Sequence, residues 1–332
     1  MRHILLHHHI FKNAGTTLDF IFWRNFDEQY VTFHGIETES TGIVDGAQLR
    51  GFLRANPSVV GVSSHHFHTQ PFREGDGEEF TGEFRFLDMV LLRHPIDRLV
   101  SIYDFFRSGG GGDPQQSALV EQLTLREWLE LMIERSPHLV NDAQVGLLAK
   151  YGRYVAPPAP VDLQRAKERL SHLALVGTVE QFDDACICAE YFLRPAFGAL
   201  DFAYVSENVS RVRSGSGRGS RIERLEEILG PSLFRRLTIL NELDIELWRA
   251  ATDEVVRRLA YLENVERRRE TFRERCRDLA TKVQAVREAE AAALAESGDL
   301  SQISYDALRP AQFFWRQARN DAAPFVRQNA SS

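Results

Sequence analysis

Near its start the chain reads His3-Ile4-Leu5-Leu6-His7-His8-His9-Ile10-Phe11-Lys12-Asn13-Ala14-Gly15-Thr16-Thr17, and this stretch decides the fold. Residues His3–Phe11 predict a short buried strand, and Asn13–Thr17 predict a turn of small polar side chains. Apolar residues with helical spacing follow from Leu18 to Phe26. A strand, a small-residue loop and a helix in this order are typical of the first unit of a nucleotide-binding α/β domain.

Further strands and helices are expected to alternate along the chain. The expected strands are Val59–Ser63, Phe86–Leu92 and Leu173–Gly177. The expected helices are Pro95–Phe106, Trp128–Ile133 and Glu180–Leu193. This alternation predicts an α/β fold with a P-loop-like parallel sheet flanked by helices.

The sequence changes in character after Asp253. Residues 254–296 are rich in Arg, Glu and Ala and contain neither Gly nor Pro, which predicts a C-terminal helical extension. Its apolar residues follow spacings of four and three, namely Phe272, Cys276, Leu279, Val283 and Val286. This seam predicts either a helix that folds back on the domain or one that forms a homodimer. We therefore divide the chain into an α/β domain (1–252), a charged helix (253–296) and a tail (297–332).

Composition excludes several classes of protein. The 332 residues are 43% hydrophobic and 26% charged, which is typical of a globular chain. A formal net charge of −7 argues against a general nucleic-acid binder, because such proteins need a basic surface. No apolar run reaches the about 18 residues of a membrane span, and the N-terminal layout is not that of a signal peptide. The chain has only three cysteines, an odd number, which argues against a disulfide framework and fits a reducing compartment. We therefore expect a cytoplasmic protein.

The first motif runs from His9 to Thr17. Its small residues would let backbone N–H groups approach an anion, and the following helix N-terminus would favour negative charge. Lys12 could place one ammonium beside a phosphate. The alternative is an ordinary strand-to-helix turn. A Walker A loop does not fit, because its lysine follows the last glycine, whereas Lys12 precedes Gly15 by three residues.

The second motif is Leu91-Leu92-Arg93-His94-Pro95-Ile96-Asp97-Arg98-Leu99-Val100-Ser101-Ile102-Tyr103. Arg93 follows an expected strand, and Ser101 lies eight residues later in the next helix. Both could point into the crevice above the sheet, where a guanidinium and a hydroxyl suit a phosphate. The alternative is that Arg93 or Arg98 only pairs with nearby acidic residues on the surface.

Together the two motifs resemble those of sulfotransferases that use 3′-phosphoadenosine-5′-phosphosulfate (PAPS). The resemblance is to the carbohydrate branch that includes the uronyl 2-O-sulfotransferases, and it covers roughly residues 3–252. The segments that carry it are His9-Ile10-x-Lys12-x-x-Gly15-Thr16-Thr17, Arg93-His94-Pro95-x-x-Arg98-x-x-Ser101-x-Tyr103, Leu175-Val176-Gly177-Thr178-Val179-Glu180-Gln181-Phe182 and Asp244-x-Glu246-Leu247-Trp248. The family usually has proline where this chain has Phe11.

The resemblance implies a role for each matching residue. Lys12 would contact the phosphosulfate and stabilise the departing phosphate. The residues implied to hold the 5′ end of the donor are Asn13, Gly15, Thr16 and Thr17. Arg93 and Ser101 would hold its 3′-phosphate. A basic loop near the end of such domains often covers the adenosine, and the residues of Asn208–Arg221 that suit this role are Arg213 and Arg218.

Histidine suits the removal of a proton from the acceptor, because its unperturbed pKa lies near neutrality. His65 and then His66 are our candidates for this base, since both follow an expected strand where crevice ligands bind. The related enzymes have a histidine base in this neighbourhood, after a glycine where this chain has Ser64. Although imidazoles bind zinc, the run His7–His9 alternates between the two faces of a strand, and we expect no metal site.

The sequence thus predicts a sulfotransferase that uses PAPS as donor. The acceptor class stays open between carbohydrate, lipid and small molecule. Two alternatives are a nucleotide-dependent phosphotransferase and an inactive nucleotide-binding scaffold that dimerises through residues 254–296. An intact set of Lys12, Arg93 and Ser101 argues against the scaffold.

Overall fold

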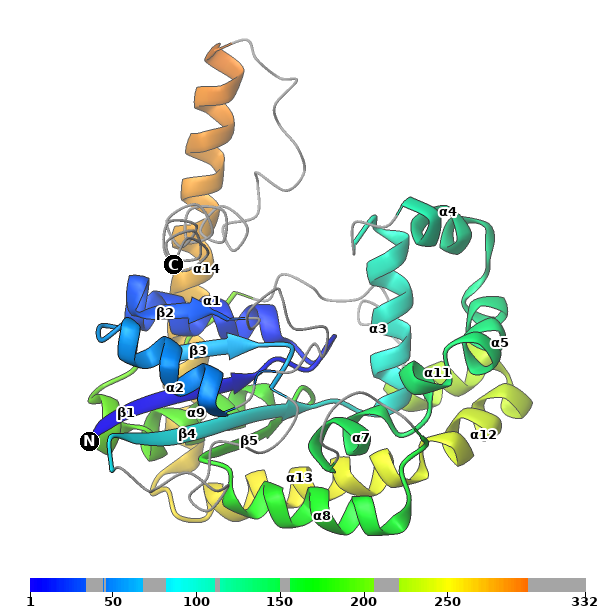
Figure 1. Cartoon of the computed structure of the whole chain (residues 1–332). Helices are drawn as coiled ribbons and strands as arrows, with labels where there is room; N and C mark the ends of the chain where they lie inside the picture. The colour runs from blue at the N-terminus through cyan, green and yellow to red at the C-terminus, as the bar shows by residue number, and fades with distance from the viewer. Residues whose placement is uncertain are drawn as a thin grey trace, which may run out of the picture.

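The computed structural model describes residues 1–33, 44, 46–67, 82–110, 114–149, 156–205 and 221–297. Its centre is a sheet of parallel strands in the order β2-β3-β1-β4-β5 (Figure 1). The strands are β1 (Arg2–His8), β2 (Tyr30–Thr32), β3 (Gly61–Ser64), β4 (Phe84–Leu92) and β5 (Leu175–Thr178). The predicted α/β class, with a parallel sheet flanked by helices, is confirmed.

The central strand β1 has its partners in register on both sides. Leu5 pairs with Gly61 of β3 and with Leu87 of β4. Alternate residues of a strand face opposite sides, so Leu5 enters one hydrophobic core whereas Ile4 and Leu6 enter another. A parallel sheet needs cover on both faces, and these fully buried leucines and isoleucine are the reason that β1 lies in its middle.

Helices pack against both faces of the sheet. The core on one face is formed with α1 (Gly15–Phe26), α9 (Phe182–Phe192) and α14 (Val265–Ser297). The cores on the other face are formed with α2 (Gly46–Ala55), α7 (Ala143–Ala149) and α8 (Pro160–His172). The helix α13 (Glu242–Leu259) contributes residues to both sides. Short helices η1 (Asp27–Gln29) and α10 (Arg194–Phe197) complete this part of the domain.

A second group of helices stands beyond the ends of β4 and β5 and has its own core (Figure 1). We call it the helical lobe. Its members are α3 (Pro95–Arg107), α4 (Pro114–Gln122), α5 (Leu125–Arg135), α6 (Pro137–Val140), α11 (Arg221–Leu229) and α12 (Pro231–Leu240). Trp128 and Tyr103 are buried in its centre, with ring centroids 5.7 Å apart. The lobe therefore holds α3, which contains most of the second motif, beside the loop that follows β1.

The C-terminal extension differs from the single helix predicted for residues 253–296. The helix α13 continues to Leu259, and α14 begins only at Val265 after a break in which Asn264 has a φ of 55°. Phe272 is fully buried in the core with α9, so the first turns of α14 fold back on the domain. The last turns extend away from it (Figure 1). Dimerisation through these turns stays a prediction, and the tail 298–332 lies outside the described residues.

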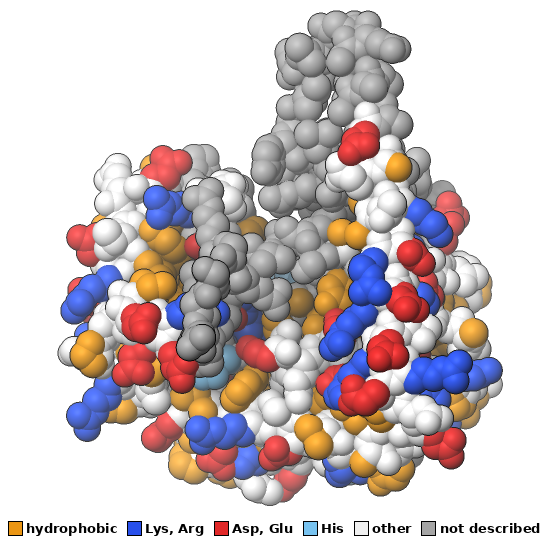
Figure 2. Space-filling view, turned by 180° about the vertical axis from the view of Figure 1, so that it is seen from behind, with side chains coloured by type: hydrophobic (Ala, Val, Ile, Leu, Met, Phe, Trp, Pro, Cys, Tyr) orange, Lys and Arg blue, Asp and Glu red, His pale blue; other side chains and the backbone are white. Residues whose placement is uncertain are grey.

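Basic and acidic side chains are mixed on the face that carries α14 (Figure 2). Arg269, for example, pairs with Asp184 of α9 and with Glu266 of its own helix. Within the described part of the chain, no helix combines the length and the apolar character that a membrane crossing requires. Cys186, Cys188 and Cys276 are free thiols.

Candidate functional site

The loop after β1 lies at the carboxyl edge of the sheet, where ligands bind in open α/β folds. The strand ends at His8, and α1 begins at Gly15 rather than at Leu18 as predicted. Lys12 and Ala14 both have left-handed backbone conformations, with φ values of 66° and 59°. This backbone allows the chain to turn within six residues from the strand into the helix.

Gly15 is required by its neighbour and not by its backbone angle. A Cβ atom at this position would lie 2.1 Å from Cδ2 and 2.2 Å from Nε2 of His9. The His9 ring therefore lies directly against the first turn of α1. Thr16 is exposed at this helix start and Thr17 is half-buried. The backbone N–H groups of Gly15 and Thr16 lie in the part of the first turn that lacks helical partners, as an anion-binding loop requires, whereas the N–H of Thr17 donates to the Ala14 carbonyl at 3.1 Å.

Arg93 joins the second motif to this loop. It follows β4, and its Nη1 donates a hydrogen bond to the Lys12 carbonyl at 3.1 Å. Its Nε donates to Asp97 at 2.7 Å. The pairing with Asp97 that we considered as an alternative does exist, but the two side chains are largely buried beside the loop rather than on the surface. The sequence prediction that the two motifs meet is therefore supported by a direct contact.

One face of α3 flanks the loop. Asp97, Ser101 and Phe105 are four residues apart, so they lie above one another on this face. The ammonium of Lys12 lies 4.3 Å from the centroid of the Phe105 ring. The Phe11 ring packs edge-on against the same ring, with centroids 5.4 Å apart. Half-buried Ser101 thus lies between the two residues of α3 that engage the loop. Phe11 thus anchors the loop to α3.

Buried polar side chains brace the loop from below. Arg98 is 4% exposed and donates hydrogen bonds to the carbonyls of Phe11 and Leu139. Burial lowers its pKa to about 10, although the Asp244 carboxylate acts in the opposite direction. The side chain of Asn13 is also buried and donates to the Leu91 carbonyl and to Gln144. The side-chain amide of Asn13 thus ties the loop to β4, and its predicted contact with the donor stays a prediction.

The two later segments of the resemblance meet the second motif. Glu180 accepts a hydrogen bond from the backbone N–H of His94 and another from the indole of Trp248, both at 2.9 Å. The His94 ring packs edge-on against Trp248, and burial lowers the pKa of His94 to about 4. Residues that are far apart in sequence therefore meet next to Arg93.

The predicted base candidates lie on the other side of β1, after β3. His65 is exposed, and its Nδ1 lies 2.7 Å from the carbonyl oxygen of His9. Since a carbonyl only accepts, Nδ1 of His65 carries the proton in this contact, and Nε2 is the nitrogen of the neutral ring that has the lone pair. His66 is half-buried, and its backbone bonds to Ser64 and Val44. The choice of His65 over His66 as the base stays a prediction.

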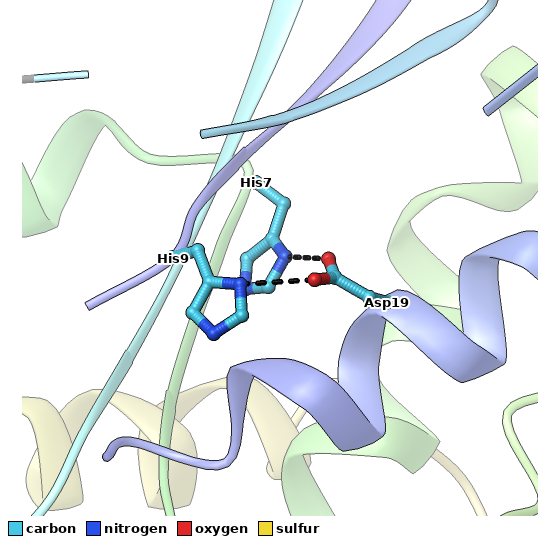
Figure 3. A group of neighbouring side chains, drawn as sticks. All are labelled: His7, His9 and Asp19. Carbon is cyan, nitrogen blue, oxygen red and sulfur yellow. Dashed lines mark hydrogen bonds and ion pairs between the residues drawn. The ribbon is translucent and has the colours of Figure 1, made fainter. Parts of the chain in front are cut away.

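A group that the sequence analysis missed lies beside His65. The buried carboxylate of Asp19, on α1, accepts hydrogen bonds from Nδ1 of His7 at 2.6 Å and Nδ1 of His9 at 2.9 Å (Figure 3). The Tyr30 hydroxyl donates to the same carboxylate at 2.7 Å. A lone acid in the apolar run Leu18–Phe22 was the signal that could have found it, because a buried carboxylate needs partners.

The same group bears on the prediction of no metal site. The alternation argument holds for His8, which points to the opposite face and pairs with Asp88, but His7 and His9 share one face. Two imidazoles and a carboxylate have the chemistry of a transition-metal site. Here each Nδ1 and both carboxylate oxygens are already engaged at hydrogen-bond distances, so we describe a hydrogen-bonded network.

Comparisons with known proteins leave the function open. No protein-family model matches the chain. An uncharacterized protein of Archaeoglobus fulgidus is 24% identical over 271 residues, which are 76% of this chain and 97% of that protein. The similarity extends over nearly the whole of that protein, but an identity this low does not assign a family. Arg213 and Arg218 of the predicted lid lie outside the described residues.

Proposed function

We propose that this protein is a sulfotransferase that moves a sulfuryl group from PAPS to an acceptor hydroxyl. The observation that carries the proposal is the contact between the two motifs. Arg93 donates to the Lys12 carbonyl, and the Lys12 ammonium lies over Phe105 of α3. Two cationic side chains and the first turn of α1 thus lie at one edge of the sheet, as a donor with a phosphate at each end of its ribose requires.

The donor would lie along this edge in a P-loop-like arrangement. The first turn of α1 at Gly15–Thr17 would bind the 5′-phosphosulfate, and Lys12 would neutralise the phosphate that departs. Arg93 and Ser101 would bind the 3′-phosphate from the side of α3. Arg93 also pairs with Asp97, which leaves its Nη2 edge for a further acceptor.

The reaction would then need one base. The Nε2 lone pair of His65 would take the proton of the acceptor hydroxyl while its oxygen forms a bond to sulfur. The bond between sulfur and the bridging oxygen of the 5′-phosphate would break, with its electron pair left on the phosphate. The products are a sulfate ester and 3′-phosphoadenosine-5′-phosphate (PAP). Lys12 would act where this negative charge develops, which is the most effective position for a preorganised donor.

Release of PAP from PAPS, measured with a panel of sugars, lipids and phenols as acceptors, tests the proposal. Lys12→Ala should lower turnover about 10²–10³-fold and lower donor affinity less, because the charge on the phosphate grows as sulfur departs. The matched control is Lys167→Ala on α8, which removes a surface lysine that pairs with Glu246. Acceptor-dependent phosphoryl transfer from ATP, with none from PAPS, would favour the phosphotransferase alternative instead.

The wider assignments belong to the same proposal. We infer a cytoplasmic enzyme whose acceptor is a carbohydrate, lipid or small molecule. A homodimer through the last turns of α14 would be detected by light scattering on the full chain, and a monomer would exclude it.

A further inference from the structure

His9 lies at the meeting point of three parts of the site. Its side chain donates to Asp19 of α1, and its ring lies against Gly15. Its backbone N–H donates to Ser64 at the end of β3. Its ring also contacts the ring of His65, with centroids 4.0 Å apart. His9 therefore separates the loop that would bind the donor from the candidate base.

The backbone of His9 sets the tautomer of His65. Because Nδ1 of His65 donates to the His9 carbonyl, the nitrogen that can accept a proton is Nε2. A neutral imidazole without such a partner exchanges between its two tautomers. The position of the His9 carbonyl depends in turn on the side chain, which is held by the Asp19 carboxylate and by the close contact with Gly15.

Asp19 is a fixed negative charge beneath His9. It is 3% exposed, and burial alone would raise its pKa. The charges and hydrogen bonds of His9 and His7 outweigh burial and hold the pKa of Asp19 well below its usual value. The His9 ring bonds this anion (Figure 3) and is also in contact with the ring of His65. The anion would therefore stabilise the positive charge that forms when His65 takes a proton.

We propose that Asp19 and His9 are positioning residues that hold His65 as the base, with Asp19 acting through His9. The inference rests on the proposed sulfuryl transfer, and it deepens the assignment of the same site. Neither residue needs to touch the donor or the acceptor. Asp19 corresponds in role to the carboxylate that orients the histidine of a catalytic triad, here acting through one additional residue.

The chain contains a matched control for this proposal. His8, between His7 and His9, points to the other face of the sheet, where its Nε2 pairs with Asp88 at 2.8 Å. Both aspartates thus bond a histidine at the end of the same strand. Asp88 is on β4 and has no contact with His9 or His65 among the interactions of the described residues. A general effect on the strand should follow either substitution, whereas a positioning effect should follow only Asp19.

Turnover with two acceptors separates these cases. Asp19→Asn should lower turnover about tenfold to a hundredfold with a neutral alcohol, which needs a base. The loss should be less than about threefold with a phenol that is ionised at the assay pH, which needs none. PAP affinity should not change. Asp88→Asn should leave the ratio between the two acceptors unchanged. Equal losses for both acceptors in Asp19→Asn would overturn the proposal.

Nitrogen NMR of the imidazoles gives a readout that does not depend on activity. In wild type, His65 should carry its proton on Nδ1, and in Asp19→Asn a mixture of tautomers should appear. An unchanged His65 tautomer in Asp19→Asn overturns the positioning role. If wild type transfers no sulfuryl group from PAPS, the proposed function fails, but the NMR comparison still decides whether Asp19 orients His65.

A second variant covers the case in which Asp19→Asn does not fold. His9→Asn keeps an N–H donor near Asp19 and removes the ring against His65, so it should show the same difference between the two acceptors. Unfolding in the presence of Zn²⁺ is one further test of the proposal. A rise in the unfolding temperature of wild type with Zn²⁺, absent in Asp19→Asn, would show that these groups bind a cation and would overturn the hydrogen-bonded arrangement.

Discussion

The carboxyl end of β1 and the contact between α9 and α14 are both well packed, but the first is packed with polar side chains and the second mainly with apolar ones. At the end of β1, the side chains of Arg98 and Asn13 are buried and hydrogen-bonded to main-chain carbonyls. Between α9 and α14, Phe272 fills an apolar core, and Arg269 pairs with Asp184 at the partly exposed rim. The difference lies in where the charges are placed.

Buried charges lower stability relative to well-packed apolar groups of the same size. A region that holds a buried arginine, a buried carboxylate and two buried imidazoles is therefore organised for something other than stability. The α9–α14 contact needs no such groups, and its ion pairs lie where water screens them. These contrasts support our proposal that the end of β1 is the functional region, whereas the apolar core at the base of α14 supports the fold. Substitutions in the two regions should therefore have different consequences.

The largest expected effect is that of His65→Ala on turnover. Loss of a general base should lower turnover with a neutral alcohol roughly 10²–10⁴-fold. PAP affinity should stay unchanged, and a phenol that is already ionised should be affected much less. Steady-state kinetics with both acceptors provides the measurement. Equal losses for the two acceptors would mean that His65 is not the base, and His66→Ala would then be compared.

Phe272→Ala should lower the stability of the fold and leave turnover nearly unchanged. Its side chain is fully buried, so truncation should lower the free energy of unfolding by about 3–5 kcal/mol. Turnover per folded molecule should change less than about twofold, since the ring contacts of Phe272 among the described residues are with Tyr204 and Arg275. Denaturant unfolding and kinetics on the same preparation would check both. A large loss of turnover in the folded variant would break the proposed division between the two regions.

A smaller effect is expected at Asp142, in the polar network that continues from Arg93 through Gln144 and Asp244. Burial raises the pKa of Asp142 to about 7, and the neighbouring Asp244 adds to this. Between about pH 4 and 7 the folded protein holds a proton that the unfolded chain releases. The free energy of unfolding from this group therefore falls as pH rises through 7.

Asp142→Asn removes this titration and can still accept the hydrogen bond from the Asp244 N–H. It should raise the free energy of unfolding by about 1–3 kcal/mol more at pH 8 than at pH 5. Unfolding curves at the two pH values would measure the difference. An equal effect at both would show that Asp142 does not carry a buried charge.

The local sequence patterns were enough to predict which two loops lie together at the carboxyl edge of the sheet. The apolar residues of β1, the small residues before α1 and the Arg93–Ser101 spacing place Lys12 and Arg93 after neighbouring strands, and these do meet. The inward position of the Asn13 side chain was not predicted, because a motif does not tell which polar side chain of a loop points inward. The buried position of Asn13 is decided by Gln144, which is 131 residues away.

Long-range pairing explains the remaining misses. Strand β2 has three residues and shows no period, so its Tyr30 could not be placed beside Asp19 from sequence. The break between α13 and α14 contains neither Gly nor Pro, so no residue type marked it in the sequence. The first turns of α14 fold back on the domain because Phe272 is buried there. Whether an apolar seam packs within a chain or between two chains depends on tertiary contacts, and the periodicity of a sequence does not reveal these contacts.

Calorimetric titration of the wild-type protein with PAP and with AMP tests the central claim most directly, because it needs no acceptor. The two nucleotides differ by the 3′-phosphate, which Arg93 and Ser101 are proposed to bind. Loss of such a charge-assisted contact costs about 1.5–3 kcal/mol, so PAP should bind roughly tenfold to a hundredfold more tightly than AMP. Arg93→Ala should remove most of this preference. Equal affinities for PAP and AMP in the wild-type protein would contradict the assignment of this site as a PAPS-binding site.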